Sequence, residues 1–386
     1  MTTRKIGLLP RILLAIILGI SMGTFAPEIL VRFFVTFNSL FSEFLNFIIP
    51  LIILGLVTPS ISDIGNGAGK MLGATILLAY TATICSGFLT YGVGELCFPA
   101  IIDSNISMAE IGEANGILPF FKVEIPAPLS VMTALVLAFT LGLGIAYLKT
   151  DYLKNVCNDF KSIIVKTIEK TIIPLLPIYI FGIFINMTHT GQVYHIITAF
   201  IKIIGVLFVL SVILLIIQYV VAGIISKKNP FKLFKEMIPV YFTALGTQSS
   251  AATIPVTLHH TIRNGVSEDI ANFVVPLCAT IHLSGSTMKI AGGALALMIM
   301  QGMPYDFTMF SGFIFMLGIT MVAAPGVPSG AIMAALGILS SMLGFDENAQ
   351  ALMIALAIAM DSFGTACNVT GDGALALMID RWFGKK

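Results

Sequence analysis

Residues 236–262 read "EMIPVYFTALGTQSSAATIPVTLHHTI", two apolar arms around a centre of glycine, threonine, glutamine and serine. The stretch "TMVAAPGVPSGAIMA" at 320–334 has the same design, with two prolines and small residues at its tip. Both are too polar at the centre for a spanning helix. Irregular backbone at membrane depth is tolerated where it is buried in protein or lines a cavity. The two stretches therefore predict re-entrant hairpins; two imperfect helices joined by loops are the alternative.

The composition places the chain in a membrane. It has 386 residues, of which 57% are hydrophobic and only 11% are charged, whereas soluble domains carry about 25% charge. The net charge of +1 gives no basic surface for nucleic acid. The five cysteines form no CxxC pair, so neither a zinc site nor a disulfide framework is expected.

The apolar segments predict an all-α polytopic membrane protein, because a helical span needs about 20 apolar residues. They are 10–30, 36–58, 71–98, 127–148, 171–188, 194–225, 270–300, 307–343 and 348–380. The first has a basic start but no small-residue cleavage site, so we interpret it as a membrane helix, with a signal peptide as the alternative. Each hairpin precedes a polar-centred helix, so the combination of hairpin and helix occurs twice. If the first hairpin enters from the cytoplasm and the second from outside, the two units form an inverted repeat, which places a binding site at the midplane.

Charge in the connections predicts the orientation. Basic residues gather before the first helix, in a predicted loop at 149–170, at 227–235 and at the end of the chain, whereas 99–126 is mainly acidic. The positive-inside rule then places both termini in the cytoplasm of a multi-pass cell-membrane protein.

A polar stripe on the last helix is the clearest functional signal. Asp361, Thr365, Asn368 and Asp372 are spaced i, i+4, i+7 and i+11, which keeps them on one helix face. A charge at the bilayer centre costs about 2.5–3.5 kcal/mol on insertion scales. The two carboxylates therefore need cationic partners: an ion, an ammonium ligand or a basic side chain. Hydrogen bonding between helices is the structural alternative.

Four segments resemble the dicarboxylate/amino acid:cation symporters, the glutamate-transporter family. They are "QSSAATIPVT" (248–257), "PLCATIHLSGS" (276–286), "PGVPSGAIM" (325–333) and "NVTGD" (368–372). The resemblance, to a divergent prokaryotic member, covers most of the chain. It implies eight transmembrane helices plus two re-entrant hairpins in an elevator-type homotrimer.

The same resemblance implies a division of the chain. Residues 1–70 and 101–190 would form the scaffold. Residues 71–100 and 191–386 would form the transport domain, with the hairpins near 236–262 and 307–343.

The resemblance also implies a substrate site. Asp361 would hold a substrate ammonium group beside Thr365, and Asn368 would bind the substrate carboxylate. Ser249 and Ser250 would bind the same carboxylate, and Ser286 replaces a similarly placed threonine. The second hairpin tip, Pro325, Gly326, Val327, Pro328 and Ser329, would gate the site.

Two departures from the family pattern change the predicted chemistry. Gly364 stands where acidic-substrate members carry an arginine, the usual bidentate partner of carboxylates, so a small neutral amino acid is expected. His282-Leu283-Ser284 replaces the Asn-Met-Asp motif that helps to bind sodium.

Lys289 follows His282 by seven residues, on roughly the same face of a continuous helix. We hypothesise that Lys289 neutralises Asp372 or a neighbouring acid and replaces a sodium ion. His282 could titrate near neutral pH, although a packed histidine is the alternative; for Lys289 the alternative is snorkelling to an interface. The set expected to bind or replace an ion is His282, Ser284, Lys289, Asn368 and Asp372. Tyr80, Thr81 and Thr83 are weaker candidates.

The predicted function is secondary transport of a small, neutral amino acid, with coupling that is sodium-independent, weakly sodium-dependent or proton-linked. The alternative is a conventional sodium-coupled dicarboxylate or acidic amino acid symporter. No cofactor is expected beyond Na⁺ or H⁺ as coupling ion, no metal site is certain, and the partners are the amino acid and membrane lipids. An ion channel is a competing class, but a channel would place like residues around a symmetry axis, whereas these polar residues are expected to converge within one protomer. An intramembrane enzyme with Asp361 and Asp372 as a catalytic dyad is excluded, because 11 residues of helix separate the two carboxylates by about 16 Å. Two carboxylates cannot share a proton across that distance.

Overall fold

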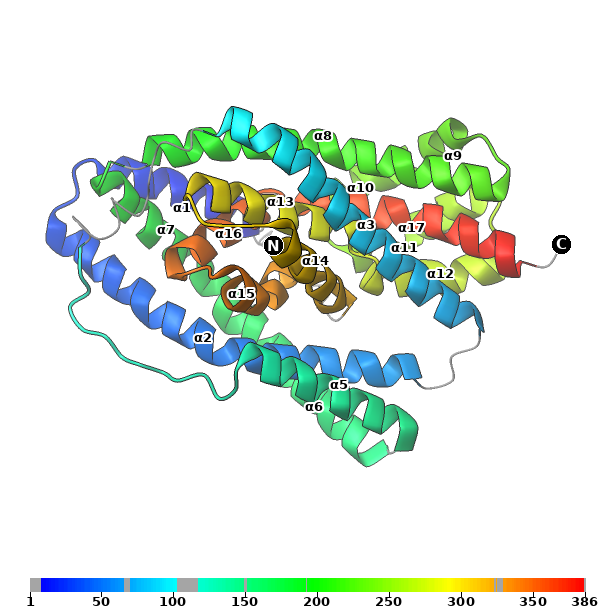
Figure 1. The fold of residues 1–386 in the computed structure, drawn as a ribbon, viewed down its shortest axis with the longest axis horizontal. Coiled ribbons are helices and arrows are strands. Elements are labelled where there is room, and N and C mark those ends of the chain that lie inside the picture. Colours follow the sequence, from blue (N-terminus) through cyan, green and yellow to red (C-terminus); the bar gives the residue numbers. More distant parts are fainter. Residues whose placement is uncertain are drawn as a thin grey trace, which may run out of the picture.

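The computed structural model describes residues 8–65, 70–102, 117–148, 151–191, 193–322, 324 and 329–384. Over these residues the chain is mainly helical and has no β-strand, and residues 117–130 form a non-helical connection. The longest helices run roughly parallel to the long axis of the molecule, with α8 along one side, α2 along the other and shorter helices between them (Figure 1). The expectation of an all-α protein with several apolar spans is confirmed.

One group of helices comes from the first half of the chain. It comprises α1 (Leu8–Gly23), α2 (Glu28–Gly65), α5 (Val131–Leu148), α6 (Asp151–Thr167), the π-helical segment η1 (Ile168–Ile172) and α7 (Ile173–His189). Helix α2 packs against α5, α6 and α7, and α1 packs against α7. Gly19 and Gly23 allow the close approach of α1 to α7, because a Cβ at either position would meet α7 atoms at 2.9 Å or less.

The second group surrounds the polar stripe. Helices α3 (Lys70–Ile101) and α8 (Val193–Ser226) are long, and α8 leads through α9 (Pro230–Glu236) into the first pair of short helices. Helix α3 packs against α13 and α14, and α8 packs against α17.

A pair of short helices followed by a broken helix occurs twice along the chain. The first unit is α10 (Ile238–Thr247), α11 (Ser250–Arg263), α12 (Glu268–Ile281) and α13 (Ser284–Met300). The second is α14 (Phe307–Val322), α15 (Gly330–Leu343), α16 (Glu347–Ala359) and α17 (Asp361–Phe383). Helices α10 and α11 pack together, as do α14 and α15. Both regions expected to form hairpins thus contain a pair of packed short helices.

Three sequence-based boundaries need correction. Residues 151–167, expected as a basic loop, form helix α6, because apolar residues such as Ile164 recur on a face that packs against α2. The segment 270–300 is interrupted at His282–Leu283, where the backbone is not helical. The segment 348–380 bends by 59° between α16 and α17.

The sequence-based count of eight transmembrane helices stays a prediction. Among the described residues, five helical stretches are long and apolar enough to cross a membrane, and six if the bent pair α16–α17 is one span. Two of the five combine consecutive elements: Asp151–His189 runs from α6 to α7, and Glu268–Met300 comprises α12 and α13. Helix α1 and helices α14 and α15 are apolar but shorter.

Candidate functional site

Helix α17 carries the polar stripe into the protein interior. Asp361 is its first residue, and Thr365, Asn368 and Asp372 follow on the same helix. Their exposed fractions are 8%, 8%, 3% and 1%. The bend at Met360 precedes the stripe, so the spacing predicted from the sequence applies within one unbroken helix.

Both oxygens of Asp361 have partners from other elements. Lys289 Nζ of α13 donates to Asp361 Oδ1. The backbone N–H of Ser329, immediately before α15, donates to Asp361 Oδ2 at 3.1 Å. The side chains of Lys289 and Asp361 are 1% and 11% exposed, so this is a buried, charge-assisted pair.

The first hairpin reaches the same turn of α17. Gln248 has the left-handed backbone that separates α10 from α11 (φ 52°), and its Nε2 donates to Ser362 Oγ at 2.8 Å. Ser249 caps α11 by accepting from the N–H of Ala252, and Ser250 is 9% exposed. Gln248 and Ser329 therefore bring the ends of both hairpin regions to Asp361 and Ser362.

Asn368 is bound to the start of α13. Its Oδ1 accepts from the N–H groups of Gly285 (2.8 Å) and Ser286 (3.3 Å), and its Nδ2 donates to Ser286 Oγ (3.0 Å). The first N–H groups of a helix have no intrahelical acceptor, and here a side-chain amide supplies one. A second Nδ2 hydrogen of Asn368 remains for a ligand.

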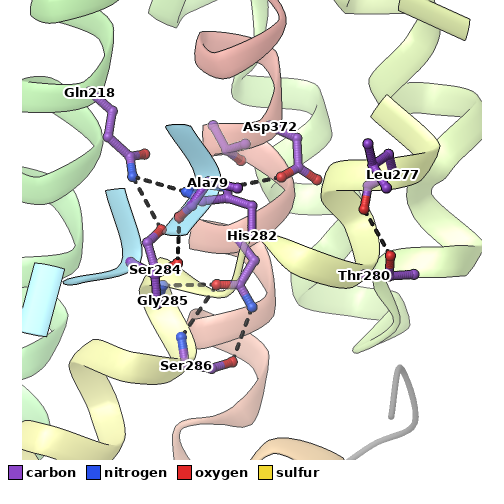
Figure 2. Close-up of polar contacts among 12 residues, drawn as sticks. Ala79, Gln218, Leu277, Thr280, His282, Ser284, Gly285, Ser286 and Asp372 are labelled. Atoms are coloured by element: carbon purple, nitrogen blue, oxygen red, sulfur yellow. Dashed lines mark hydrogen bonds and ion pairs between the residues drawn. The ribbon is translucent and has the colours of Figure 1, made fainter. Parts of the chain in front are cut away.

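A second buried pair lies deeper along α17. His282 Nδ1 is 2.9 Å from Asp372 Oδ1, and both side chains are at most 1% exposed. Gln218 Nε2 of α8 lies 3.5 Å from His282 Nε2 and donates to Ser284 Oγ at 3.1 Å (Figure 2). Asp372 Oδ2 and Gln218 Oε1 have no hydrogen-bond partner among the described residues.

The structure does not place Lys289 on Asp372. Lys289 pairs with Asp361, the other acid of the stripe, and Asp372 pairs with His282. The sequence argument placed His282 and Lys289 on one face of a continuous helix. The helix is broken at His282–Leu283, so the seven-residue spacing no longer places the two side chains on one face. His282 precedes α13, whereas Lys289 lies inside it.

Gly364 leaves room for the lysine. A Cβ built on Gly364 would lie 3.1 Å from Lys289 Cδ, 3.3 Å from Cε and 3.4 Å from Nζ. A larger residue at this position would need the space that the end of the lysine side chain occupies. The arginine that the family resemblance implies at position 364 would therefore need the space that Lys289 fills.

The weaker candidates on α3 have other partners. Tyr80 OH donates to the carbonyl of Phe315 on α14, and the hydroxyls of Thr81 and Thr83 donate to carbonyls of their own helix. Ser86 is the α3 hydroxyl that reaches this region, where its Oγ donates to the carbonyl of Ser284 at 2.6 Å.

Sequence reasoning missed Ser86, Gln218 and Ser362. The sequence does contain an indication of Gln218, because a single amide interrupts the apolar run that forms α8. The structure shows that this side chain is buried. Of the predicted gate residues, Pro325, Gly326, Val327 and Pro328 lie outside the described residues. Where the structure describes the chain, no group of three or more His, Cys, Asp or Glu residues could hold a metal ion.

Comparison with known proteins shows the family of the chain. A family model described as the sodium:dicarboxylate symporter family matches residues 8–382. The chain therefore belongs to this family, a class of secondary transporters, and the predicted resemblance is confirmed. This membership also confirms the expectation of a transporter rather than an enzyme.

Similar proteins span nearly the whole chain. A serine/threonine transporter SstT of Acinetobacter baumannii (strain ATCC 17978) is 26% identical, covering 97% of each chain. The protein of the same name from Acinetobacter baylyi is 25% identical, covering 98% of each chain. That from Streptococcus suis is 27% identical, covering 86% of this chain and 94% of its own.

Proposed function

We propose that this chain is a secondary transporter of small neutral amino acids, with serine and threonine as the first candidates. The observation that carries the proposal is the convergence at the start of α17, where Asp361 and Ser362 contact residues from α13 and both hairpin regions. Asp361 supplies an anion for a substrate ammonium group, and Asn368, Ser249 and Ser250 supply donors for a carboxylate. The names of the similar proteins support this substrate class.

The proposed transport mechanism is an elevator. The group α1, α2, α5, α6 and α7 would be the scaffold, and α3 with α8 to α17 would be the transport domain. Contacts within the first group and around α17 support this division. Eight membrane helices with two oppositely oriented hairpins, cytoplasmic termini and a homotrimer in the cell membrane belong to the same proposal.

The proposed coupling does not require sodium at Asp361 or Asp372. Each carboxylate of the stripe already has a basic partner, Lys289 for Asp361 and His282 for Asp372. Sodium prefers oxygen ligands and carboxylates, and a carboxylate paired with a protein cation is a poorer ligand. Uptake driven by a proton gradient, or equilibration alone, is the proposed consequence.

Lys289 also favours a second candidate function. Its ammonium group lies beside Gly364, where an arginine would bind the side-chain carboxylate of an acidic substrate. An acidic amino acid symporter would use Lys289 in that role. We favour the neutral substrate because Asp361 already neutralises the lysine in this structure.

Uptake into proteoliposomes tests these proposals. Labelled serine, threonine, aspartate and glutamate are offered with sodium or with choline on both sides, with and without a proton gradient. Serine or threonine uptake that persists in choline and that excess aspartate does not reduce is expected. Uptake of aspartate in preference to serine would favour the second candidate, and loss of serine uptake in choline would reject sodium-independent coupling.

A further inference from the structure

We infer that Lys289 is a tethered substitute for the substrate's ammonium group. Without substrate, the Lys289 ammonium group pairs with Asp361. When substrate binds, the substrate's ammonium group takes the place of the lysine's at this carboxylate. This inference rests on the proposed function, because it takes Asp361 as the ammonium-binding residue.

The contacts of Asp361 show why an exchange is needed. Lys289 contacts Oδ1, and the N–H of Ser329 contacts Oδ2. An incoming ammonium group needs a charge-assisted bond to this carboxylate, and Lys289 already makes one. The lysine therefore competes with the substrate from within the site.

Ser329 supplies an independent sign of a missing ligand. The residue is 2% exposed, and its hydroxyl has no hydrogen-bond partner among the described residues. Buried polar groups are nearly always paired, so an unpaired one requires an explanation. A ligand ammonium bound at Asp361 would be next to this residue, whose backbone already contacts the same carboxylate.

Lysine is also a side chain suited to such an exchange. Lysine carries its ammonium on a flexible four-carbon stem, and Gly364 presents no side chain against the last three atoms of that stem. The displaced ammonium stays inside the site, so the site contains one lysine and one aspartate charge whether it is empty or holds a zwitterion.

This charge balance has a consequence for transport. A bare carboxylate is expensive at membrane depth, so an empty carrier with unpaired Asp361 would return slowly. Lys289 pairs Asp361 in the empty carrier and lets it return without a bound cation. Net uptake requires this empty return, whereas exchange of external for internal substrate does not.

The test compares Lys289→Met with Lys202→Met in the full-length protein. Lys202 is an exposed lysine on α8 that contacts the carbonyl of Ile101, away from the site. Labelled serine uptake is measured into vesicles that are empty (net uptake) or loaded with unlabelled serine (exchange). For Lys289→Met we expect exchange within about threefold of wild type, net uptake reduced at least tenfold and tighter serine binding; Lys202→Met should match wild type.

Equal loss of exchange and net uptake in folded Lys289→Met, or no loss of either, would overturn the inference. Absence of any serine uptake or exchange by wild type would instead reject the proposed function. The two failures are therefore distinguishable.

A second variant covers the case in which Lys289→Met does not fold. Lys289→Ala lacks the three carbons and the ammonium group that n-propylammonium contains. We expect propylammonium, but not propanol, to raise the Tm of Lys289→Ala and to weaken its serine binding at least tenfold, with neither effect in wild type or Lys202→Ala. Failure of propylammonium to stabilise the variant, or to compete with serine, counts against the inference.

Discussion

Two buried pairs of an acidic and a basic side chain lie along α17 and have different surroundings. Lys289–Asp361 lies at the first turn of α17, where the carboxylate also contacts the N–H of Ser329 from the second hairpin region. His282–Asp372 lies deeper, and its neighbour is Gln218 from the long helix α8. We propose that the first pair meets the substrate, whereas the second joins α8, α17 and the break before α13.

The comparison shows two different kinds of basic residue paired with the two acids of one helix. A lysine keeps its charge on a flexible stem that can move. A histidine has a short, rigid ring whose charge depends on its protonation. The proposed substrate exchange suits the first residue, and a fixed connection between helices suits the second.

Removing the carboxylate of the first pair should have the largest effect on transport. Asp361→Asn removes the anion for the substrate ammonium and leaves Lys289 buried without its partner, so we expect serine uptake to fall at least 100-fold. Uptake into proteoliposomes at several serine concentrations measures the change. Asp380→Asn, in the last turns of the same helix and bonded to Ser267, is the control and should retain uptake; serine uptake near wild type in Asp361→Asn would remove Asp361 from the site.

Breaking the second pair should act on stability more than on substrate affinity. His282→Ala leaves Asp372 buried without its partner, and breaking such a pair costs about 3–5 kcal/mol. The double variant His282→Ala/Asp372→Ala should recover much of this loss, because it removes both polar partners. Thermal unfolding of the detergent-solubilised full chain measures the double-mutant cycle.

The first hairpin contains a control for this cycle. His260 Nδ1 lies 2.8 Å from Glu236 Oε1, a similar distance, but these side chains are 12% and 26% exposed. This pair is only partly buried, and Glu236 keeps a second basic partner, Arg263, whose Nε lies 3.1 Å from Glu236 Oε1. His260→Ala should therefore lower Tm much less than His282→Ala. Equal losses in the two variants would mean that the burial of His282–Asp372 does not set its contribution.

The sequence predicted the stripe on α17 because a helical repeat alone places Asp361, Thr365, Asn368 and Asp372 on one face. It also predicted two regions of short paired helices, because polar residues interrupt apolar arms at 236–262 and 320–334. These inferences depend on local spacing and composition, which the sequence displays directly.

The partners of the two acids could not be derived in the same way. Lys289 was expected near His282 on a continuous helix, and the break at His282–Leu283 removes that relation. Gln218 and Ser86 come from helices distant in sequence, so only the packing of α8 and α3 brings them to this region. Identifying such partners requires tertiary structure.

The smallest effect is expected from one methyl group between the lysine and α17. In Gly364→Ala the new Cβ would lie 3.1 Å from Lys289 Cδ, a contact that requires a shift of a few tenths of an ångström. The lysine is flexible, so the protein should fold, but the pair with Asp361 should be displaced and apparent serine affinity should change about two- to fivefold. Gly205→Ala on α8, where the added Cβ meets no atom within 4 Å, is the matched control. A tighter affinity would indicate that the methyl group weakens a competing lysine, as the tethered-ammonium model requires, whereas a weaker affinity would indicate that Lys289 helps to hold the substrate and would favour an acidic amino acid.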